Sequence, residues 1–202
     1  MRPPLILASA SPRRAELLAR AGWERQLAPV DCDESWHPGE TPVAYVQRVA
    51  RAKAELAAAR HGPTTSPTLL LAADTTVWLE GDGSAPPMAK PAERGEARAM
   101  LRSLTAGRAH HVTTACAFVE LSTGAHSQLC ETTEVRMRHL DDAAFEAFIG
   151  PYLDAGEWTD KAGGYAIQGL AAALVTGITG SYTSVVGLPL AQVVAHLEAL
   201  SR

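Results

Sequence analysis

The run Leu69-Leu70-Leu71-Ala72-Ala73 constrains the fold of this chain more than any other segment. Every position in it is apolar, whereas a strand with one face in water alternates between apolar and polar residues. The pattern is typical of an interior strand that helices cover on both sides. We expect the strand to end at the polar residues Asp74-Thr75-Thr76. The segment therefore predicts a mostly buried sheet flanked by helices.

Other segments supply the remaining elements of a mixed α/β protein. The run Leu5-Ile6-Leu7-Ala8 predicts a second buried strand. Helical spacing of apolar residues, with cap residues or prolines at several starts, predicts helices over residues 15–21, 41–60, 93–104, 141–148 and 189–200. Two long strands, residues 111–121 and 128–138, are expected around a hairpin turn at 122–125, and residues 81–87 are expected to form a loop or hairpin tip.

Length and composition limit the classes of protein that remain. A chain of 202 residues, of which 47% are hydrophobic and 20% charged, is expected to form one globular domain over residues 1–202. The formal net charge of −4 gives no general attraction for nucleic acid or for anionic membranes. Any site for phosphate must therefore be built locally from a few cationic groups.

Cysteines and apolar runs indicate the compartment. Cys32, Cys116 and Cys130 are widely spaced and form no Cys-x-x-Cys pair, so we expect reduced thiols rather than disulfides or a zinc site. The apolar run at residues 5–8 is shorter than the ~7 to 15 residues of a signal peptide. No segment reaches the ~18 apolar residues of a membrane span, so a cytoplasmic location is expected.

The first candidate site follows the first strand. Ser9, Ser11, Arg13 and Arg14 supply two hydroxyls and two cations directly ahead of a helix, whose first free N–H groups attract anions. One interpretation is a cradle for phosphate. The other is an ordinary helix start with solvated arginines, and the segment alone does not decide between them.

Lys53 and Asp74 form the second candidate. Lys53 comes three residues after Ala50 and four before Ala57, which places it on the apolar stripe of its helix. An inward lysine needs an anion or must extend toward water, and we favour the anion. Asp74, at the expected strand end, is either a metal ligand or general base, or the cap of a turn. Lys90 and Lys161 lie in turn-like segments and by themselves suggest only surface residues.

Several common sites are absent from the sequence. The chain contains no Gly-x-x-x-x-Gly-Lys-[Ser/Thr] loop, no Gly-x-Gly-x-x-Gly after a strand and no Gly-x-Ser-x-Gly segment. Its seven histidines show no His-x-x-x-His spacing on a helix, so a histidine metal site is not expected.

Taken together, the motifs resemble the Maf family of nucleotide pyrophosphatases in order and spacing. The resemblance covers essentially the whole chain. It rests on Leu7 to Arg14, Glu40-Thr41-Pro42, Arg48 to Ala54, Ala73 to Val77, Lys90-Pro91, Gly107 to Thr114, Asp160 to Gly169, Gly180-Ser181-Tyr182 and Val186 to Leu190. Gly164 and Ala89 depart from the residues usual in that family, alanine and glycine respectively, and neither change removes a functional group.

The resemblance implies an α/β fold of two lobes around a deep cleft, a homodimer, and metal-dependent cleavage between the α- and β-phosphates of a nucleoside triphosphate. The form of the 160–169 segment is similar to that of enzymes acting on dTTP and UTP, with a house-cleaning role and a link to arrest of cell division. It implies that Asp74 is the proton acceptor and that Arg13, Thr75 and Gln168 set base specificity. It also implies that Glu34, Lys53 and Lys90 line the phosphate and metal site.

Residue chemistry agrees with these roles. Arg13 can bind phosphate oxygens bidentately, with Lys53 and Lys90 as point charges, and Glu34 and Asp74 offer oxygen ligands suited to Mg²⁺ or Mn²⁺. Gln168 carries the donor and acceptor that would match a pyrimidine edge. Two alternatives remain: a 7-methyl-GTP pyrophosphatase and a nucleotide-binding regulator without catalysis. Each of these functions involves a nucleotide. Each therefore requires the candidate residues, from Ser9 to Gln168, to converge on one cavity.

Overall fold

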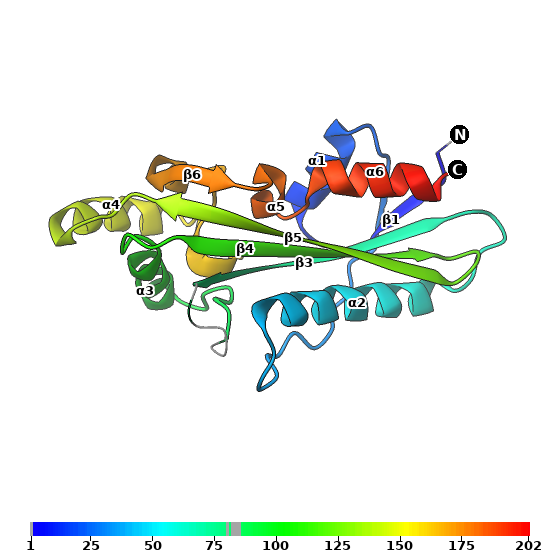
Figure 1. Ribbon diagram of the computed structural model, residues 1–202, viewed down its shortest axis with the longest axis horizontal. Helices are drawn as coiled ribbons and strands as arrows, with labels where there is room; N and C mark the ends of the chain where they lie inside the picture. Colours follow the sequence, from blue (N-terminus) through cyan, green and yellow to red (C-terminus); the bar gives the residue numbers. More distant parts are fainter. Residues whose placement is uncertain (1, 80, 82–85) are drawn as a thin grey trace.

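The computed structural model describes residues 2–79, 81 and 86–202. Its strands form one six-stranded sheet in the order β2-β1-β3-β4-β5-β6, shown in Figure 1. Strand β1 runs parallel to both of its neighbours, and the remaining pairs are antiparallel. The strands are β1 (Leu5–Leu7), β2 (Gln26–Leu27), β3 (Leu69–Leu79), β4 (His110–Glu120), β5 (Ala125–Met137) and β6 (Val175–Thr179). The predicted mixed α/β class is confirmed.

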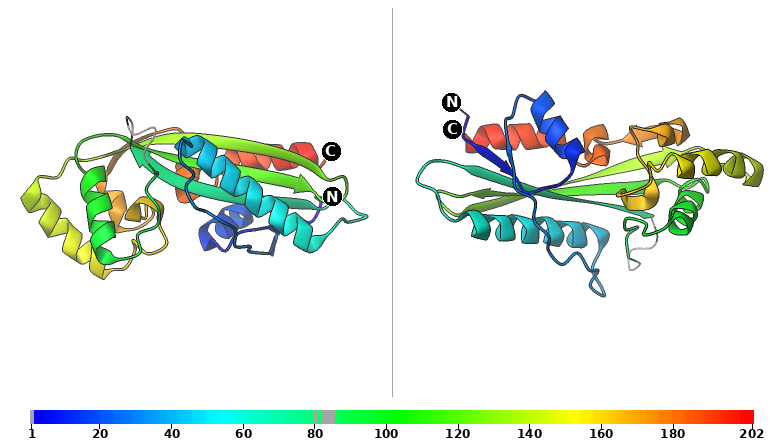
Figure 2. Two further views of the ribbon diagram at one scale, coloured as in Figure 1. Left: turned by 90° about the horizontal axis from the view of Figure 1, so that it is seen from below. Right: turned by 180° about the vertical axis from the view of Figure 1, so that it is seen from behind.

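Helices cover both faces of this sheet, as Figures 1 and 2 show for α2 on one face and α6 on the other. The helices of the described residues are α1 (Pro12–Arg20), α2 (Pro42–His61), α3 (Arg94–Leu104), α4 (Asp142–Asp154), α5 (Tyr182–Val186) and α6 (Leu190–Leu200). Two short 3₁₀ segments, η1 (Ala162–Gly164) and η2 (Leu170–Leu174), follow α4. None of the described helices is both long and apolar enough to cross a membrane.

Strand β3 has a hydrophobic core on each side. Leu69, Leu71 and Ala73 belong to a core cluster with side chains of α1, α3, α4 and α6. Leu70 and Ala72 belong to a second cluster, which contains the apolar stripe of α2. Because successive side chains of a strand point to opposite faces, an uninterrupted apolar run fits only a strand covered on both. The prediction from this run is confirmed.

The predicted end of β3 at Asp74 is wrong. Strand β3 continues to Leu79 because Thr75 to Leu79 pair with His110 to Thr114 of β4. What ends near Asp74 is the neighbouring strand: β1 stops at Leu7, and the last backbone hydrogen bond at this junction runs from the Ala8 N–H to the Leu71 carbonyl oxygen. Beyond Leu71, the edge of β3 opposite β4 is therefore open until the bridge between Val77 and Met88.

Element bounds differ from expectation mainly at the ends and in one glycine-rich segment. Helix α1 begins earlier than predicted, at Pro12, and α4 continues through Pro151 to Asp154. Strands β2 and β6 and helix α5 were not predicted. Of the expected loop at residues 81–87, residues 82–85 lie outside the described residues. Strand β6 exists because Val175 to Thr179 pair with the end of β5, a tertiary contact.

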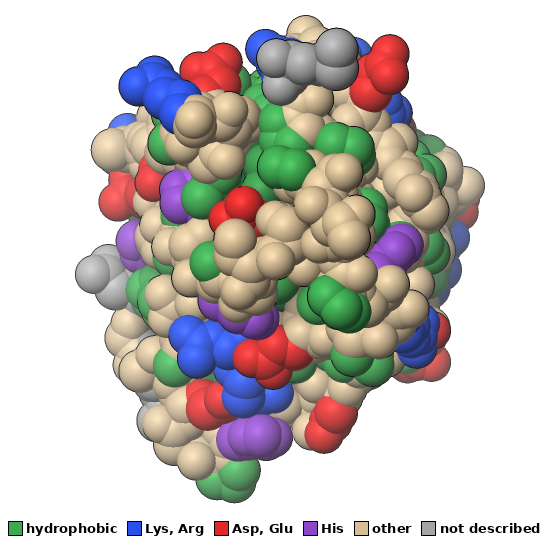
Figure 3. Space-filling model, turned by 90° about the vertical axis from the view of Figure 1, so that its right-hand side faces the viewer, with side chains coloured by type: hydrophobic (Ala, Val, Ile, Leu, Met, Phe, Trp, Pro, Cys, Tyr) green, Lys and Arg blue, Asp and Glu red, His purple; other side chains and the backbone are tan. Residues whose placement is uncertain are grey.

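The surface at the end of the molecule that holds both termini mixes the two signs of charge. Figure 3 shows Lys and Arg side chains beside Asp and Glu side chains on this face, with apolar groups between them. Interspersed charges screen one another and produce no strong field of a single sign. On this face the described residues therefore present no continuous basic surface.

A buried histidine at the start of β4 makes stability depend on pH. His110 is fully buried, its Nε2 lies 2.9 Å from the Tyr165 hydroxyl, and its Nδ1 has no hydrogen-bond partner among the described residues. Burial, with a smaller contribution from His111, lowers the pKa of His110 from 6.5 to about 4. The folded protein thus holds this ring neutral where the unfolded chain would protonate it.

We expect the free energy of unfolding to fall as pH drops from about 6.5 to about 4, by up to about 3 kcal/mol from this one group. The unfolded chain binds the extra proton in this range, so acid favours unfolding. Urea unfolding of the wild type and of His110→Gln at intervals between these pH values measures the contribution. Parallel profiles for the two proteins would contradict it.

Candidate active site

A cavity of about 380 Å³ lies beside the open edge of β3. Its lining comes from the β1–α1 turn, the segment before α2, α2 itself, β3, residues 160–168 and residues 185–187. All of the candidate residues named from the sequence line it: Ser9, Ser11, Arg13, Arg14, Glu34, Lys53, Asp74, Thr75, Lys90 and Gln168. The required convergence on one cavity is therefore present. The division into two lobes around a deep cleft stays a prediction.

The β1–α1 turn presents polar groups to this cavity. Ser11 is the N-cap of α1, but its hydroxyl makes no capping hydrogen bond. The first intrahelical bond at this end is from the Ala15 N–H to the Ser11 carbonyl oxygen, which leaves the N–H groups of Arg13 and Arg14 outside the helix hydrogen bonds. A helix start with free N–H groups favours an anionic ligand.

Arg14 is held by three hydrogen bonds. Its Nε donates to the Gly187 carbonyl oxygen at 2.8 Å, and its terminal nitrogens donate to Ser9 Oγ and Thr75 Oγ1, each at 3.0 Å. Arg13 is less restrained, since its side chain makes one hydrogen bond to the described residues, from Nε to the Val186 carbonyl oxygen at 3.4 Å. The terminal nitrogens of Arg13 therefore remain available to a ligand, whereas Arg14 is in large part committed to joining α1, β3 and the turn at Gly187.

The Thr75 hydroxyl belongs to a directed chain of hydrogen bonds. Thr114 Oγ1 donates to the Ser184 carbonyl oxygen at 2.8 Å, so it must accept in its 2.9 Å contact with Thr75 Oγ1. Thr75 donates its only hydroxyl proton there and accepts from Arg14. Toward a ligand, Thr75 can therefore act only as a further acceptor.

Lys53 joins two carboxylates at the opposite side of β3. Its Nζ lies 2.8 Å from Asp74 Oδ1 and 2.7 Å from Glu34 Oε1. Asp74 faces α2 because it alternates with Ala73 and Thr75 along the strand, and Lys53 occupies the inward stripe of α2, as its spacing predicted. The anion that an inward lysine requires is thus the Asp74–Glu34 pair.

Burial governs the protonation of this cluster. It raises the pKa of the Asp74 carboxyl above its ordinary value, although Lys53 and Arg14 oppose the rise. Burial alone would lower the pKa of Lys53, but attraction to Asp74 and hydrogen bonds to Asp74 and Glu34 outweigh it and raise that pKa. Lys53 therefore stays charged, and Asp74 accepts a proton more readily than an exposed aspartate does.

The segment that carries Glu34 has no regular secondary structure and is fixed to α2 by two side chains. The Tyr45 hydroxyl donates to the Glu34 carbonyl oxygen at 2.9 Å, and Arg48 donates to the Ser35 carbonyl oxygen at 2.8 Å. Arg48 is itself bound by both carboxylate oxygens of Glu40. Burial raises the pKa of Tyr45 to about 12, so its hydroxyl remains a donor at neutral pH. Tyr45 and Arg48 thus position the Glu34 backbone.

The donor set fits a hard divalent cation. Lys53 contacts one oxygen of Glu34 and one of Asp74, and the second oxygen of each makes no hydrogen bond to the described residues. No group of three His, Cys, Asp or Glu side chains within the described ranges could hold a metal alone. Mg²⁺ is commonly bound through one or two carboxylates with substrate phosphates completing its shell, so two carboxylates suffice.

The cavity also contains two residues to which the sequence assigned no role. Asp160 and Lys161 line the cavity beside Arg13, and Asp160 has a φ of 58°, which is uncommon for a residue with a side chain. Burial, reinforced by Arg13, lowers the pKa of Lys161. The only sequence signal was their place in the motif that ends at Gln168, since their local context suggested a surface turn.

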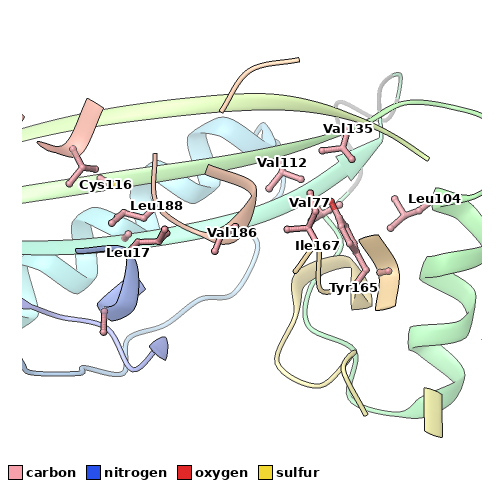
Figure 4. Close-up of a cluster of buried hydrophobic side chains, with 14 of the residues drawn as sticks. Leu17, Val77, Leu104, Val112, Cys116, Val135, Tyr165, Ile167, Val186 and Leu188 are labelled. Atoms are coloured by element: carbon pink, nitrogen blue, oxygen red, sulfur yellow. The ribbon is translucent and has the colours of Figure 1, made fainter. Parts of the chain in front are cut away.

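One end of the cavity is apolar. Val77, Val112, Tyr165 and Ile167 line it and lie close together in Figure 4. They come from β3, β4 and the segment after η1. The charged groups come from the start of α1, the segment that carries Glu34, α2, Asp74 of β3, Lys90 and residues 160–161. The cavity can thus accept a ligand with one anionic end and one flat, largely apolar end.

Comparisons with known proteins concern the chain as a whole. The Maf-like protein family matches residues 4–200. A dTTP/UTP pyrophosphatase from Bordetella parapertussis is 46% identical over 202 residues, spanning 98% of this chain and 92% of the relative. Proteins of the same name from Anaeromyxobacter dehalogenans and Myxococcus xanthus are 42% and 45% identical, over 98% and 96% of this chain and 94% and 91% of theirs.

A solved structure supports the fold. A HAM1 protein from Coxiella burnetii superposes with a TM-score of 0.54 over 98% of this chain and 99% of its own, at 19% sequence identity. Identity this low concerns the architecture only. The family match and the identity to curated relatives, both over nearly the full length, are the stronger finding, and they show that this chain belongs to the Maf family.

Proposed function

We propose that this protein hydrolyses nucleoside triphosphates, chiefly dTTP, UTP and related or modified pyrimidine nucleotides, to the monophosphate and pyrophosphate. The relatives that match over nearly the whole chain are named dTTP/UTP pyrophosphatases. The observation that carries the proposal is the single cavity in which the β1–α1 turn meets the Lys53–Asp74–Glu34 cluster. Such a cavity suits a triphosphate at one end and a base at the other.

The triphosphate would lie along the cationic side. Donors to phosphate oxygens come from Ser9, Ser11, Arg13 and the N–H groups at the start of α1. Arg14, which donates a hydrogen bond to Ser9, adds a further positive charge next to these donors. Lys90, which is exposed at the cavity rim, would reach the outer phosphates. Departing pyrophosphate carries several negative charges, so groups aimed at those oxygens lower the barrier more than a covalent nucleophile would.

Asp74 would act as the general base. Its buried carboxylate accepts a proton from a water molecule whose oxygen attacks the α-phosphorus. The bond between that phosphorus and the bridging oxygen breaks, and the electron pair leaves with pyrophosphate. Lys53 holds Asp74 and Glu34 in place. A divalent cation, Mg²⁺ or Mn²⁺, held by Glu34 and Asp74, supplies neutralisation of phosphate charge when bound.

Base selection would come from the opposite rim. The Gln168 amide offers one acceptor and two donors, which match the adjacent carbonyl and N–H groups of thymine or uracil. Val77 and Ile167 would contact the ring, with Arg13 beside it. Thr75 would contribute as an acceptor and through its bond to Arg14. In the cell we propose a cytoplasmic homodimer with a house-cleaning role. Light scattering would test the dimer, and cell fractionation would test the location.

A substrate panel tests the function. We expect dTTP and UTP with Mg²⁺ or Mn²⁺ to yield the monophosphate and pyrophosphate, and chelation of the cation to stop the reaction. Turnover of 7-methyl-GTP far above that of dTTP would overturn the pyrimidine assignment. Nucleotide binding without product under any condition would replace the enzyme with a nucleotide-binding regulator.

A further inference from the structure

The position of the Gln168 side chain depends on the backbone that carries it. It is exposed at the cavity rim, and its side-chain amide makes no hydrogen bond to the described residues. A free side chain can reach a ligand with a defined geometry only when the backbone that carries it is fixed. The contacts of the next two residues, Gly169 and Leu170, therefore decide where the amide lies.

Gly169 lies directly against the carboxylate of Glu157. Its φ of −112° lies outside the left-handed region that favours glycine. A Cβ added at this position, however, would overlap the carboxylate of Glu157. The Glu157 carboxylate thus occupies the space in which the side chain of residue 169 would stand.

Glu157 also binds the backbone at this point. Its Oε2 accepts a hydrogen bond from the Leu170 N–H at 2.7 Å, a charge-assisted bond across the chain. Glu157 is only half-buried, but the adjacent Trp158 indole donates to the Leu153 carbonyl oxygen at 3.1 Å and ties this turn to α4. A continuous set of contacts therefore runs from α4 through Glu157 to the backbone beside Gln168.

We infer that Glu157 is a positioning residue for Gln168 and, through it, determines the preference of this site for bases that present a carbonyl beside an N–H, as uracil and thymine do. This inference rests on the proposed function, because it assumes that Gln168 meets the base. Glu157 itself is not among the residues that line the cavity. Its carboxylate fixes the Gly169–Leu170 backbone, and this backbone sets the position from which the Gln168 side-chain amide reaches the base.

The experiment compares Glu157→Ala, Glu157→Gln, Gly169→Ala and the double variant E157A/G169A with the wild type. Calorimetry with α,β-methylene-UTP and α,β-methylene-CTP in Mn²⁺ measures the preference as a ratio of Kd values, and UTP and CTP turnover gives KM and kcat. Glu24→Ala is the matched control, because it removes the same charge from an exposed position in the turn before β2.

We expect Glu157→Ala to lower the UTP-over-CTP preference about tenfold, mainly through a weaker Kd and a higher KM for UTP, because one charge-assisted bond is lost. Glu157→Gln keeps an acceptor for the Leu170 N–H and should restore most of the preference. Gly169→Ala should reduce the preference in the wild type but add little in the Glu157→Ala background, where the overlapping carboxylate is gone.

Two results would overturn the inference. One is a uniform loss of affinity for both analogues in Glu157→Ala, with the ratio unchanged, which a merely structural role produces. The other is an effect of Gly169→Ala that is equal in both backgrounds. Failure of the proposed function has a different signature, since a wild type that releases no pyrophosphate still reports the preference through the binding ratio.

Discussion

Asp74→Asn is expected to slow pyrophosphate release by roughly 10³-fold while nucleotide binding persists. Asparagine has the shape of aspartate and can still accept the Lys53 hydrogen bond through its amide oxygen, which the carboxylate accepts at 2.8 Å. It cannot, however, take a proton from water at neutral pH. The kinetic effect should therefore fall on kcat and the Kd for nucleotide should change little.

Release of pyrophosphate from dTTP, together with calorimetric binding of α,β-methylene-UTP, measures both quantities. Asp154→Asn provides the control, because Asp154 is an exposed residue paired with Arg94 and does not line the cavity. Wild-type turnover in Asp74→Asn would remove Asp74 from the role of base. Loss of binding in step with turnover would show that Asp74 acts mainly by holding the nucleotide and its cation and not as the base.

Lys53→Met is expected to destabilise the protein by about 3–5 kcal/mol at pH 7 and to abolish turnover. Methionine fills the inward stripe of α2 but leaves the 8% exposed Asp74 without its cation. An unpaired carboxylate at this depth costs more than the pair itself contributes, because its charge is no longer compensated.

The destabilisation should shrink as pH falls toward 5. Burial already raises the pKa of Asp74, and removing Lys53 raises it further, so the folded variant binds a proton that the unfolded chain releases. Stability relative to the wild type therefore increases as pH decreases. Urea unfolding at pH 7 and pH 5 checks this, with K53M/D74N as the control in which the buried charge is absent. An identical difference at both pH values, or a double variant no more stable than Lys53→Met, would contradict the argument.

Local patterns predicted the parts of the fold that depend on local rules. The two-faced apolar run of β3, the Thr41–Pro42 start of α2 and the Asp141 cap of α4 are matters of side-chain period and capping, which act within a few residues. Lys53 was identified in the same way, from its place on the α2 stripe. Arg13, Arg14 and Asp74 were candidates from their places after strands. The resemblance added Glu34 and Lys90, and the structure places all of these residues around one cavity.

Local rules could not predict the pairing between strands that are far apart in the sequence. The sequence suggested that β3 stops at Asp74, because polar residues follow an apolar run, but pairing with β4 carries the strand five residues further, to Leu79. Strand β6 and helix α5 lie in a segment rich in glycine. The conformation of β6 depends on its pairing with β5, and the end of α5 is held by the hydrogen bond from Arg14 to the Gly187 carbonyl oxygen. Sequence spacing contains no information on these partners.

The sequence by itself determined which chemical groups are present and which local elements carry them: an inward lysine, a carboxylate after an apolar run, and cations at a helix start. Only the tertiary structure decided that these groups meet. The early end of β1 opens the edge of β3, so that Asp74 on one face of the sheet and Thr75 on the other both line the same cavity. The physical reason is that a site built across a sheet edge depends on which neighbouring strand ends first, and that depends on pairing between distant segments.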